Sequence, residues 1–368
     1  MSQAPFEESK TQYYHHGRFS FAGGSVPNAY TAYRTYGDST KPCIVYPTCY
    51  GGKLDSQLHM IGPNKALDST QYFIVTFALF SNGEQSSSPS NTPEPYNGPY
   101  FPVVTYEDNI RAQHAVLVEK LGVKRIYCVI GFSMGGQQAY YWPVMFPDFV
   151  DKFVVICGSA RTSPHNQCFL EGPRIALAAS RDYQDGHYTT KPQHGIRAFA
   201  RVYSAWAYGQ AWYRQNLYLY GGKYTDLNDF IRSEWEAGHL ANWDANDMLV
   251  LLRTWQMGDI SKIQSIAPSL QGDLVGVLKT ITAKGLIMPC VTDLYFPPED
   301  SEAEVEAMGS DKSQLQKIPS IWGHRGKHSL CRPILIHADS SRCAAGGGAN
   351  PEDIQFVAGY VRKFLKKQ

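Results

Sequence analysis

The 368-residue sequence lacks long apolar runs and a charge imbalance. No stretch approaches the roughly 18–20 apolar residues that span a bilayer, and the opening MSQAPFEESK has neither the basic nor the apolar region of a signal peptide. The 34 basic and 33 acidic residues give a formal charge of +1, so composition gives no electrostatic reason to expect nucleic acid or a membrane as partner. We therefore expect a cytoplasmic protein with a small-molecule substrate, and we leave open a homodimer.

The eight cysteines include no C-x-x-C pair, which argues against zinc and redox motifs. Four of them lie inside apolar runs, where a reduced cysteine behaves as a small hydrophobic residue: Cys43, Cys128, Cys157 and Cys290. We expect free thiols, no metal site and no bound cofactor.

Short β-rich segments alternate with helical segments along most of the chain. The predicted strands are rich in β-branched and aromatic residues and cover residues 32–36, 43–47, 72–77, 125–131, 153–157, 285–291 and 317–322. Residues 105–121 predict a helix that Thr105 and Asp108 cap and Gly122 ends. This alternation predicts an α/β fold with a mostly parallel sheet and helices on both faces.

The alternation stops between residues 168 and 270. This stretch is helix-like and unusually aromatic, as in RVYSAWAYGQAWYRQNLYLYGG (201–222). We expect it to form a helical cap over the active site, inserted between two parts of the core, residues 1–167 and 271–368. Packing of cap against core accounts for most of these aromatic residues.

The motif G-x-S-x-G occurs at residues 131–135, with Ser133 at its centre. An apolar strand precedes it and a helix-compatible run follows, which is the setting of a nucleophile elbow: a sharp strand-to-helix turn that exposes the serine hydroxyl. The motif in this setting predicts the α/β-hydrolase fold with Ser133 as nucleophile.

A serine hydroxyl needs a base and a group that orients the base. In this fold the acid and the histidine follow the serine in that order. Asp293 comes just after the predicted strand 285–291, and His324 follows the one ending at residue 322, so both would lie at strand ends, where catalytic side chains converge. A turn residue ahead of two prolines is the alternative for Asp293.

The tetrahedral intermediate of acyl transfer needs backbone N–H donors. Met134 directly follows the nucleophile at a helix N-terminus and is one candidate. The second should come from the loop PTCYGG (47–52), with Cys49 as first choice and Tyr50 as second. Because no elbow surrounds Cys49, we do not expect it to be a nucleophile.

From residue 32 to the C-terminus, the chain resembles the homoserine O-acetyltransferase family of the α/β-hydrolases. The blocks that carry the likeness are VTYEDNIRAQHAVLVEKLGV (104–123), GFSMGGQQAYYW (131–142), ARTSPHN (160–166), WDANDML (243–249), TDLYFPPED (292–300) and WGHR (322–325). The resemblance implies a ping-pong reaction in which the serine takes an acyl group from an acyl-CoA, such as acetyl-CoA, and passes it to a hydroxyl. It supports the roles of Ser133, Asp293 and His324.

The resemblance also implies substrate-binding positions. An arginine and a tyrosine seven residues later hold the homoserine carboxylate in the family, and Arg201 and Tyr208 match that spacing. The family's aspartate after the catalytic histidine, which binds the homoserine amine, is Arg325 here, and an arginine would repel an ammonium. We therefore expect an acceptor other than homoserine, and Tyr50 is a further candidate contact.

Residues 326–343 interrupt the junction between the histidine block and the segment before the final helix, predicted at 350–365. The flanks join sensibly without them, and the codons at both edges can form splice sites. We interpret this segment as a retained intron of a fungal gene, with a genuine loop as the alternative.

The leading functional prediction is a serine-dependent acyltransferase that moves an acyl group from acyl-CoA to a small hydroxylated metabolite. Hydrolysis of a carboxylic ester or thioester is the close alternative, because both reactions share every catalytic residue and differ in how well the pocket excludes water. A non-catalytic binding protein is the remaining alternative.

Overall fold

The computed structural model describes residues 9–83, 85–326 and 350–367, and its centre is one eight-stranded sheet. The strands are β1 (Gln12–Phe21), β2 (Gly24–Tyr36), β3 (Cys43–Pro47), β4 (Phe73–Phe77), β5 (Ile126–Phe132), β6 (Lys152–Ile156), β7 (Lys284–Met288) and β8 (Ser313–Leu315). They lie in the order β1-β2-β4-β3-β5-β6-β7-β8, antiparallel at the first two pairings and parallel at the rest. The predicted α/β-hydrolase fold with a mostly parallel sheet is confirmed.

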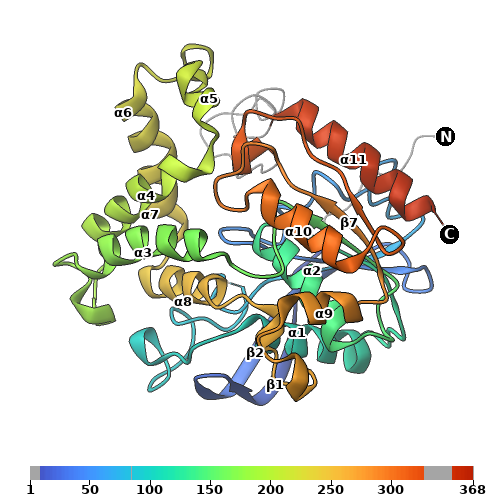
Figure 1. The fold of residues 1–368 in the computed structure, drawn as a ribbon. Coiled ribbons are helices and arrows are strands. Elements are labelled where there is room, and N and C mark those ends of the chain that lie inside the picture. Colours follow the sequence, from blue (N-terminus) through green and yellow to red (C-terminus); the bar gives the residue numbers. More distant parts are fainter. Residues whose placement is uncertain (1–8, 84, 327–349, 368) are drawn as a thin grey trace, which may run out of the picture.

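Helices cover both faces of this sheet (Figure 1). Those packed on or beside it are α1 (Tyr106–Ala115), α2 (Met134–Met145), α9 (Leu274–Thr280), α10 (Pro298–Met308) and α11 (Pro351–Lys366). In β6, Val155 meets Gly136 of α2, whereas Ile156 lines a pocket with Val357 of α11. Because successive side chains of a strand point to opposite faces, α2 and α11 lie on opposite sides of the sheet.

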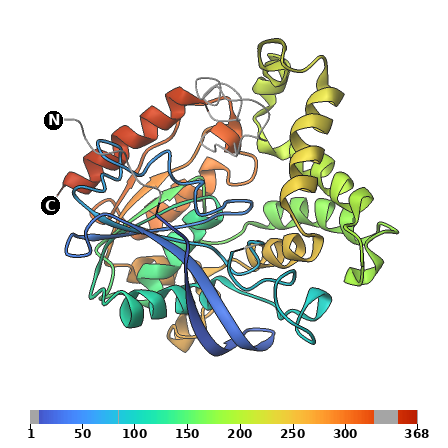
Figure 2. The same ribbon diagram turned by 180° about the vertical axis from the view of Figure 1, so that it is seen from behind.

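Of the helices between β6 and β7, all except α9 gather to one side of the sheet in both ribbon views (Figures 1 and 2). They are α3 (Pro164–Ala178), α4 (Gln193–Ala207), α5 (Gln210–Arg214), α6 (Leu227–Phe230), α7 (Ala237–Asn242) and α8 (Ala245–Gln256). The chain also has short 3₁₀ helices, which are η1 (Gly98–Tyr100), η3 (Gln184–Gly186), η4 (Leu217–Gly222), η6 (Ile260–Lys262), η7 (Pro268–Leu270) and η8 (Gly323–Gly326), and two π-helical segments, η2 (Val116–Lys120) and η5 (Ile231–Glu236). We call α3 to α8 with their connections the cap helices.

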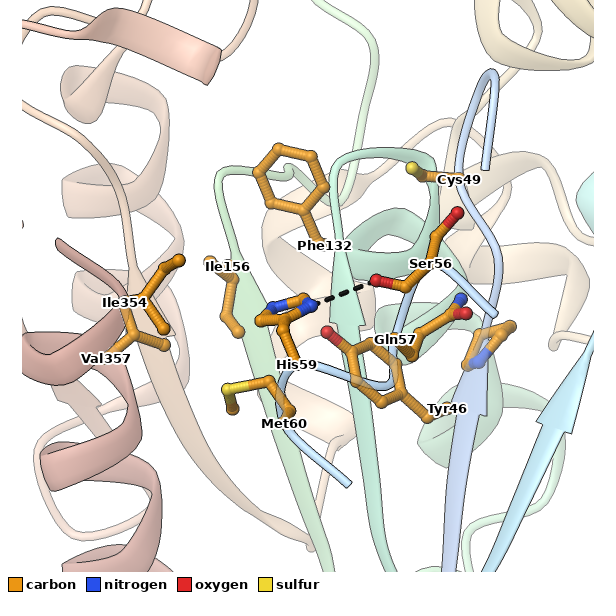
Figure 3. A pocket seen from close by; sticks show the side chains of 11 residues that line it. Tyr46, Cys49, Ser56, Gln57, His59, Met60, Phe132, Ile156, Ile354 and Val357 are labelled. Carbon is orange, nitrogen blue, oxygen red and sulfur yellow. Dashed lines mark hydrogen bonds between the residues drawn. The ribbon is translucent and has the colours of Figure 1, made fainter. Parts of the chain in front are cut away.

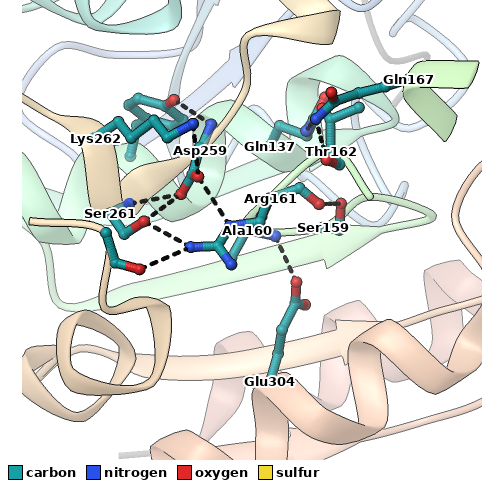
Figure 4. Close-up of polar contacts among 12 residues, drawn as sticks. Gln137, Ser159, Ala160, Arg161, Thr162, Gln167, Asp259, Ser261, Lys262 and Glu304 are labelled. Atoms are coloured by element: carbon teal, nitrogen blue, oxygen red, sulfur yellow. Dashed lines mark hydrogen bonds and ion pairs between the residues drawn. The ribbon is translucent and has the colours of Figure 1, made fainter. Parts of the chain in front are cut away.

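The chain enters and leaves the cap helices at one place, where polar contacts tie the two segments together (Figure 4). Arg161 and Asp259 form an isolated antiparallel bridge and a 2.8 Å ion pair, and Arg161 also donates to the Ser261 hydroxyl at 2.8 Å. Glu304 of α10 accepts the backbone N–H of Ala160 at 2.6 Å. The base of the cap helices is therefore fixed to the core.

Several predicted elements need correction. The predicted strand 317–322 is wrong: β8 is Ser313–Leu315, and beyond it only Ile318 pairs, in a single bridge with Cys290. Pro319 has no N–H to donate, which limits pairing there. The sequence also missed β1 and most of β2; β1 is an edge strand exposed along most of its length, and Pro27 lies inside β2.

The helix predicted at 105–121 is confirmed as α1 followed by η2, and Thr105 and Asp108 form the predicted capping box. Over the residues that the structure describes, no helix has both the length and the apolar character needed to cross a bilayer. The segment interpreted as a retained intron lies, apart from Gly326, outside the described residues and stays a prediction.

Candidate active site

Ser133 sits at the sharp turn between β5 and α2. Its backbone adopts φ 57° and ψ −125°, a left-handed conformation that is strained for a residue with a side chain. The turn requires Gly131, because a Cβ there would come within 1.9 Å of the Gly135 carbonyl oxygen. The G-x-S-x-G motif thus forms the tight turn that presents the serine hydroxyl.

A second close approach supports this turn from β6. A Cβ on Gly158 would lie 2.8 Å from the Ser133 carbonyl oxygen and 3.1 Å from the Cα of Gly136. The chain after β6 therefore passes directly beside the elbow, where a glycine alone fits without backbone movement. The role of Gly158 could not be predicted from the sequence, because no local motif surrounds it.

The structure brings Ser133, His324 and Asp293 together although up to 191 positions separate them. His324 Nε2 is 2.8 Å from Ser133 Oγ, and His324 Nδ1 is 2.7 Å from Asp293 Oδ2. All three residues are buried. With one ring nitrogen facing an acidic oxygen and the other facing the hydroxyl, this arrangement can remove the serine proton.

The loop that carries Asp293 fixes the direction of its carboxylate. Asp293 Oδ1 accepts the backbone N–H groups of Tyr295 at 2.8 Å and Phe296 at 3.1 Å, which leaves Oδ2 to face His324. An aspartate that accepts the N–H two residues on forms an Asx turn, for which Asp before a turn is itself a sequence signal.

Aromatic rings enclose the imidazole of His324. Ring centroids of Phe132, Tyr295 and Phe296 lie 4.7, 4.8 and 5.6 Å from it. Cys157 Sγ also lies within 4.8 Å of the ligand atoms of Asp293 and His324. Both ring nitrogens of His324 already face Asp293 or Ser133, so this cluster leaves no free imidazole nitrogen for a metal ion.

The two residues predicted to supply oxyanion donors, Met134 and Cys49, lie beside Ser133. Met134 is the first residue of α2. Gln138 of the same helix donates to the Thr48 carbonyl at 3.0 Å, which holds the loop that carries Cys49 against the elbow. Burial raises the pKa of the Cys49 thiol to about 12, so this cysteine stays a neutral thiol near pH 7.

Tyr50 connects the loop at residues 47–52, which we call the oxyanion loop, to the cap helices. Its ring stacks on Tyr203 of α4 at a centroid distance of 5.6 Å and on Trp243 at 6.0 Å, and its hydroxyl donates to the Met248 carbonyl at 3.3 Å. The aromatic cap therefore packs directly above the loop after β3.

Arg201 and Tyr208 do not meet as a pair. The side chain of Arg201 is 45% exposed and binds Glu236 and Asn228 within the cap helices. Helix α4 ends at Ala207 and Tyr208 has an extended backbone, so the helical periodicity that would keep the two on one face is broken. Tyr208 is fully buried.

Arg325 follows His324 in η8 and is 8% exposed. Its guanidinium carbon lies 4.9 Å from the centroid of the Trp235 ring and 6.0 Å from that of Tyr208. Its charge also acts on the phenol of Tyr208, where it opposes the rise in pKa that burial causes. Of the predicted substrate-binding residues, Arg325, Tyr208 and Tyr50 thus line the boundary between core and cap.

An apolar pocket borders the oxyanion loop on the face that α11 covers (Figure 3). Its described lining residues are Tyr46, Pro47, Cys49, Ser56, Gln57, His59, Met60, Phe132, Ile156, Ile354 and Val357. His59 Nδ1 is 2.9 Å from the Ser56 carbonyl oxygen, and burial lowers its pKa. Among these described lining residues none is a carboxylate.

Comparison with known proteins places this geometry in a family. The family model described as alpha/beta hydrolase fold matches residues 42–190. A probable esterase of Corynebacterium glutamicum is 30% identical over 92% of this chain and 95% of its own length. An ethyl acetate hydrolase of Pseudomonas veronii is 32% identical over 81% of this chain and 83% of its own.

Two further matches are an acyltransferase and the crystal structure of an ester hydrolase. A homoserine O-acetyltransferase of Methanosalsum zhilinae is 29% identical, over 79% of this chain and 59% of its own length. The crystal structure of an acetylester hydrolase from Corynebacterium glutamicum superposes with a TM-score of 0.85 at 26% identity, over 97% of this chain and 96% of that one. The chain therefore belongs to the α/β-hydrolase family, as an enzyme of the branch that includes both esterases and homoserine acyltransferases.

Proposed function

We propose that this enzyme cleaves a small carboxylic ester through an acyl-Ser133 intermediate and passes the acyl group to water. The observation that carries the proposal is the hydrogen-bonded series Ser133 Oγ, His324 and Asp293, at 2.8 and 2.7 Å. These distances lie within the range of about 2.6–3.2 Å that proton transfer requires.

In the first half-reaction, Ser133 Oγ attacks the ester carbonyl carbon while His324 Nε2 takes its proton. Asp293 holds the Nδ1–H and stabilises the imidazolium. The Met134 and Cys49 backbone N–H groups donate to the oxyanion, each worth about 3–4 kcal/mol in such sites. The intermediate collapses to the acyl-serine, and His324 gives its proton to the departing alkoxide oxygen.

The second half-reaction repeats these steps with water. His324 takes a proton from water, whose oxygen attacks the acyl carbon, and a second tetrahedral intermediate releases the carboxylic acid and restores the Ser133 hydroxyl. A hydroxylated metabolite in place of water would give acyl transfer instead, with the same groups in the same roles.

We place hydrolysis ahead of transfer because two relatives matched over 95% and 83% of their own length carry the names of ester hydrolases, whereas the homoserine O-acetyltransferase relative is matched over 59% of its own length. Acyl transfer from acetyl-CoA to a small alcohol is the second candidate, which the homoserine O-acetyltransferase relative favours. Arg325 argues against homoserine as acceptor in that case, because its charge would repel the ammonium group. An R325D variant should then accept homoserine better than the unmodified enzyme does.

Intact-protein mass spectrometry tests the proposal directly. The enzyme is mixed with p-nitrophenyl acetate or acetyl-CoA and quenched early, in parallel with S133A and with S310A, which removes an exposed hydroxyl. We expect an acetyl adduct from the ester on the unmodified enzyme and on S310A and none on S133A. Adduct formation on S133A, or none on any of the three, would overturn the acyl-serine. Partition of the adduct between water and added alcohols then ranks hydrolysis against transfer.

A further inference from the structure

Arg325 is a buried cation without an acidic partner among the described residues. No carboxylate in the described part of the chain lies within the 4.0 Å of an ion pair, and its Nε has no hydrogen-bond acceptor there. A buried charge is costly unless it is paired and hydrogen-bonded. The Trp235 ring compensates in part through its π face, but a neutral ring does not neutralise the charge.

The nearby acid, Glu234, is already engaged elsewhere. Its Oε2 accepts from the Tyr224 hydroxyl at 2.6 Å and lies 3.7 Å from the Lys223 ammonium. What faces Arg325 from the cap is instead the ring of Tyr208, at 6.0 Å, whose hydroxyl is 3.2 Å from that of Tyr220. A guanidinium beside a hydroxyl offers hydrogen-bond donors with a positive charge, which is the chemistry that recognises a carboxylate.

This cation is close to the reacting groups. Arg325 directly follows the base His324, and its charge acts on the thiol of Cys49 and the phenol of Tyr203, where it opposes the rise in pKa that burial causes. Tyr203 lies beside Tyr295, whose ring contacts His324. Because His324 delivers its proton to the oxygen of the departing alcohol, the residue next to it is placed to meet the alcohol portion of the substrate.

We propose that Arg325, with the Tyr208 hydroxyl, binds a carboxylate on the alcohol portion of the ester, so that the substrates are acyl esters of small hydroxy acids. This inference rests on the proposed acyl-serine function. It assigns a substrate class that composition and the catalytic residues leave open.

Matched esters test the subsite. The probes are 3-acetoxypropanoate, its neutral counterpart 3-acetoxypropanamide and the cationic 3-acetoxypropylammonium, compared by kcat/KM from acetate release. We expect the carboxylate ester to be preferred over the amide by about 10- to 100-fold, the value of a hydrogen bond to a charged group. The preference should appear mainly in KM, and the cationic ester should be the poorest of the three.

The variant R325Q should bring the ratio of carboxylate ester to amide near one while the amide is still hydrolysed. R325K keeps the charge without the planar fork and should retain part of the preference, and Y208F should lower it by several-fold. The control is R197Q, which removes an exposed arginine of the cap helix α4, and it should keep the full preference. Should R325Q fail to fold, product inhibition of the unmodified enzyme by 3-hydroxypropanoate against 3-hydroxypropanamide reports the same selectivity.

Equal kcat/KM for the carboxylate ester and the amide in the unmodified enzyme would overturn the carboxylate subsite, and so would an undiminished preference in R325Q. Both results leave the proposed function standing, because acetate is still released. Absence of acetate release from all three esters, together with absence of an acetyl adduct on Ser133, would overturn the proposed function itself.

Discussion

Replacement of Asp293 by asparagine should abolish most activity without unfolding the enzyme. The structure dictates how the asparagine must point: the backbone N–H groups of Tyr295 and Phe296 both donate to Oδ1, so the amide oxygen has to stay there. The amide NH₂ then faces His324 Nδ1, where Oδ2 now accepts at 2.7 Å. Two donors would oppose each other, so His324 must place its proton on Nε2.

A protonated Nε2 cannot take the proton of Ser133, which removes the general base from the first step. We expect kcat to fall by about 10³–10⁴-fold, equivalent to about 4–5.5 kcal/mol of barrier. The melting temperature should stay within about 3 °C, because both backbone hydrogen bonds to position 293 survive. Initial rates of p-nitrophenyl acetate hydrolysis and thermal unfolding measure the two quantities, and D148N, at an exposed aspartate, is the control. A D293N enzyme with more than a tenth of normal kcat would refute the assigned orientation.

Three further changes test other parts of the structure. The variant G158A should lose about 1–3 kcal/mol of stability and about 10²-fold in activity, measured by denaturant unfolding and initial rates, because its Cβ would lie 2.8 Å from the Ser133 carbonyl; normal activity would contradict this packing. Burial raises the pKa of Glu304 to about 8, above its unfolded value, so the folded enzyme loses stability as pH rises from about 4.5 to 8. The melting temperature of E304Q minus that of the unmodified enzyme should therefore increase from pH 5 to pH 8.5. A difference that stays constant would show that the carboxyl does not titrate in this range. R161A should lower the melting temperature by several degrees, since Asp259 loses the 2.8 Å ion pair at the base of the cap, and D259N in the same background should add little further loss.

Local sequence patterns were enough to predict the candidate catalytic residues. Gly131, Ser133 and Gly135 lie within five residues, so the elbow is a local feature that the motif and its flanking strand and helix reveal. Asp293 and His324 were predictable from their order and from the strands before them, because parallel strands bring their carboxyl ends to one edge of a sheet. The alternation of helices and strands was also predictable, because the spacing of apolar residues within a short stretch of chain indicates a helix or a strand.

Other features depend on contacts between residues far apart in the sequence, which local patterns do not predict. Strand β1 is exposed along most of its length and pairs with β2, whereas Pro319 limits the pairing that the apolar residues around it suggested. The spacing of Arg201 and Tyr208 could not reveal that α4 ends between them and leaves Arg201 exposed. In the sequence, Arg325 stood out only because the family that the chain resembles has an aspartate at this position. Its burial against Trp235, with no carboxylate partner among the described residues, depends on the cap packing over the core, and this packing joins segments that are far apart in the sequence.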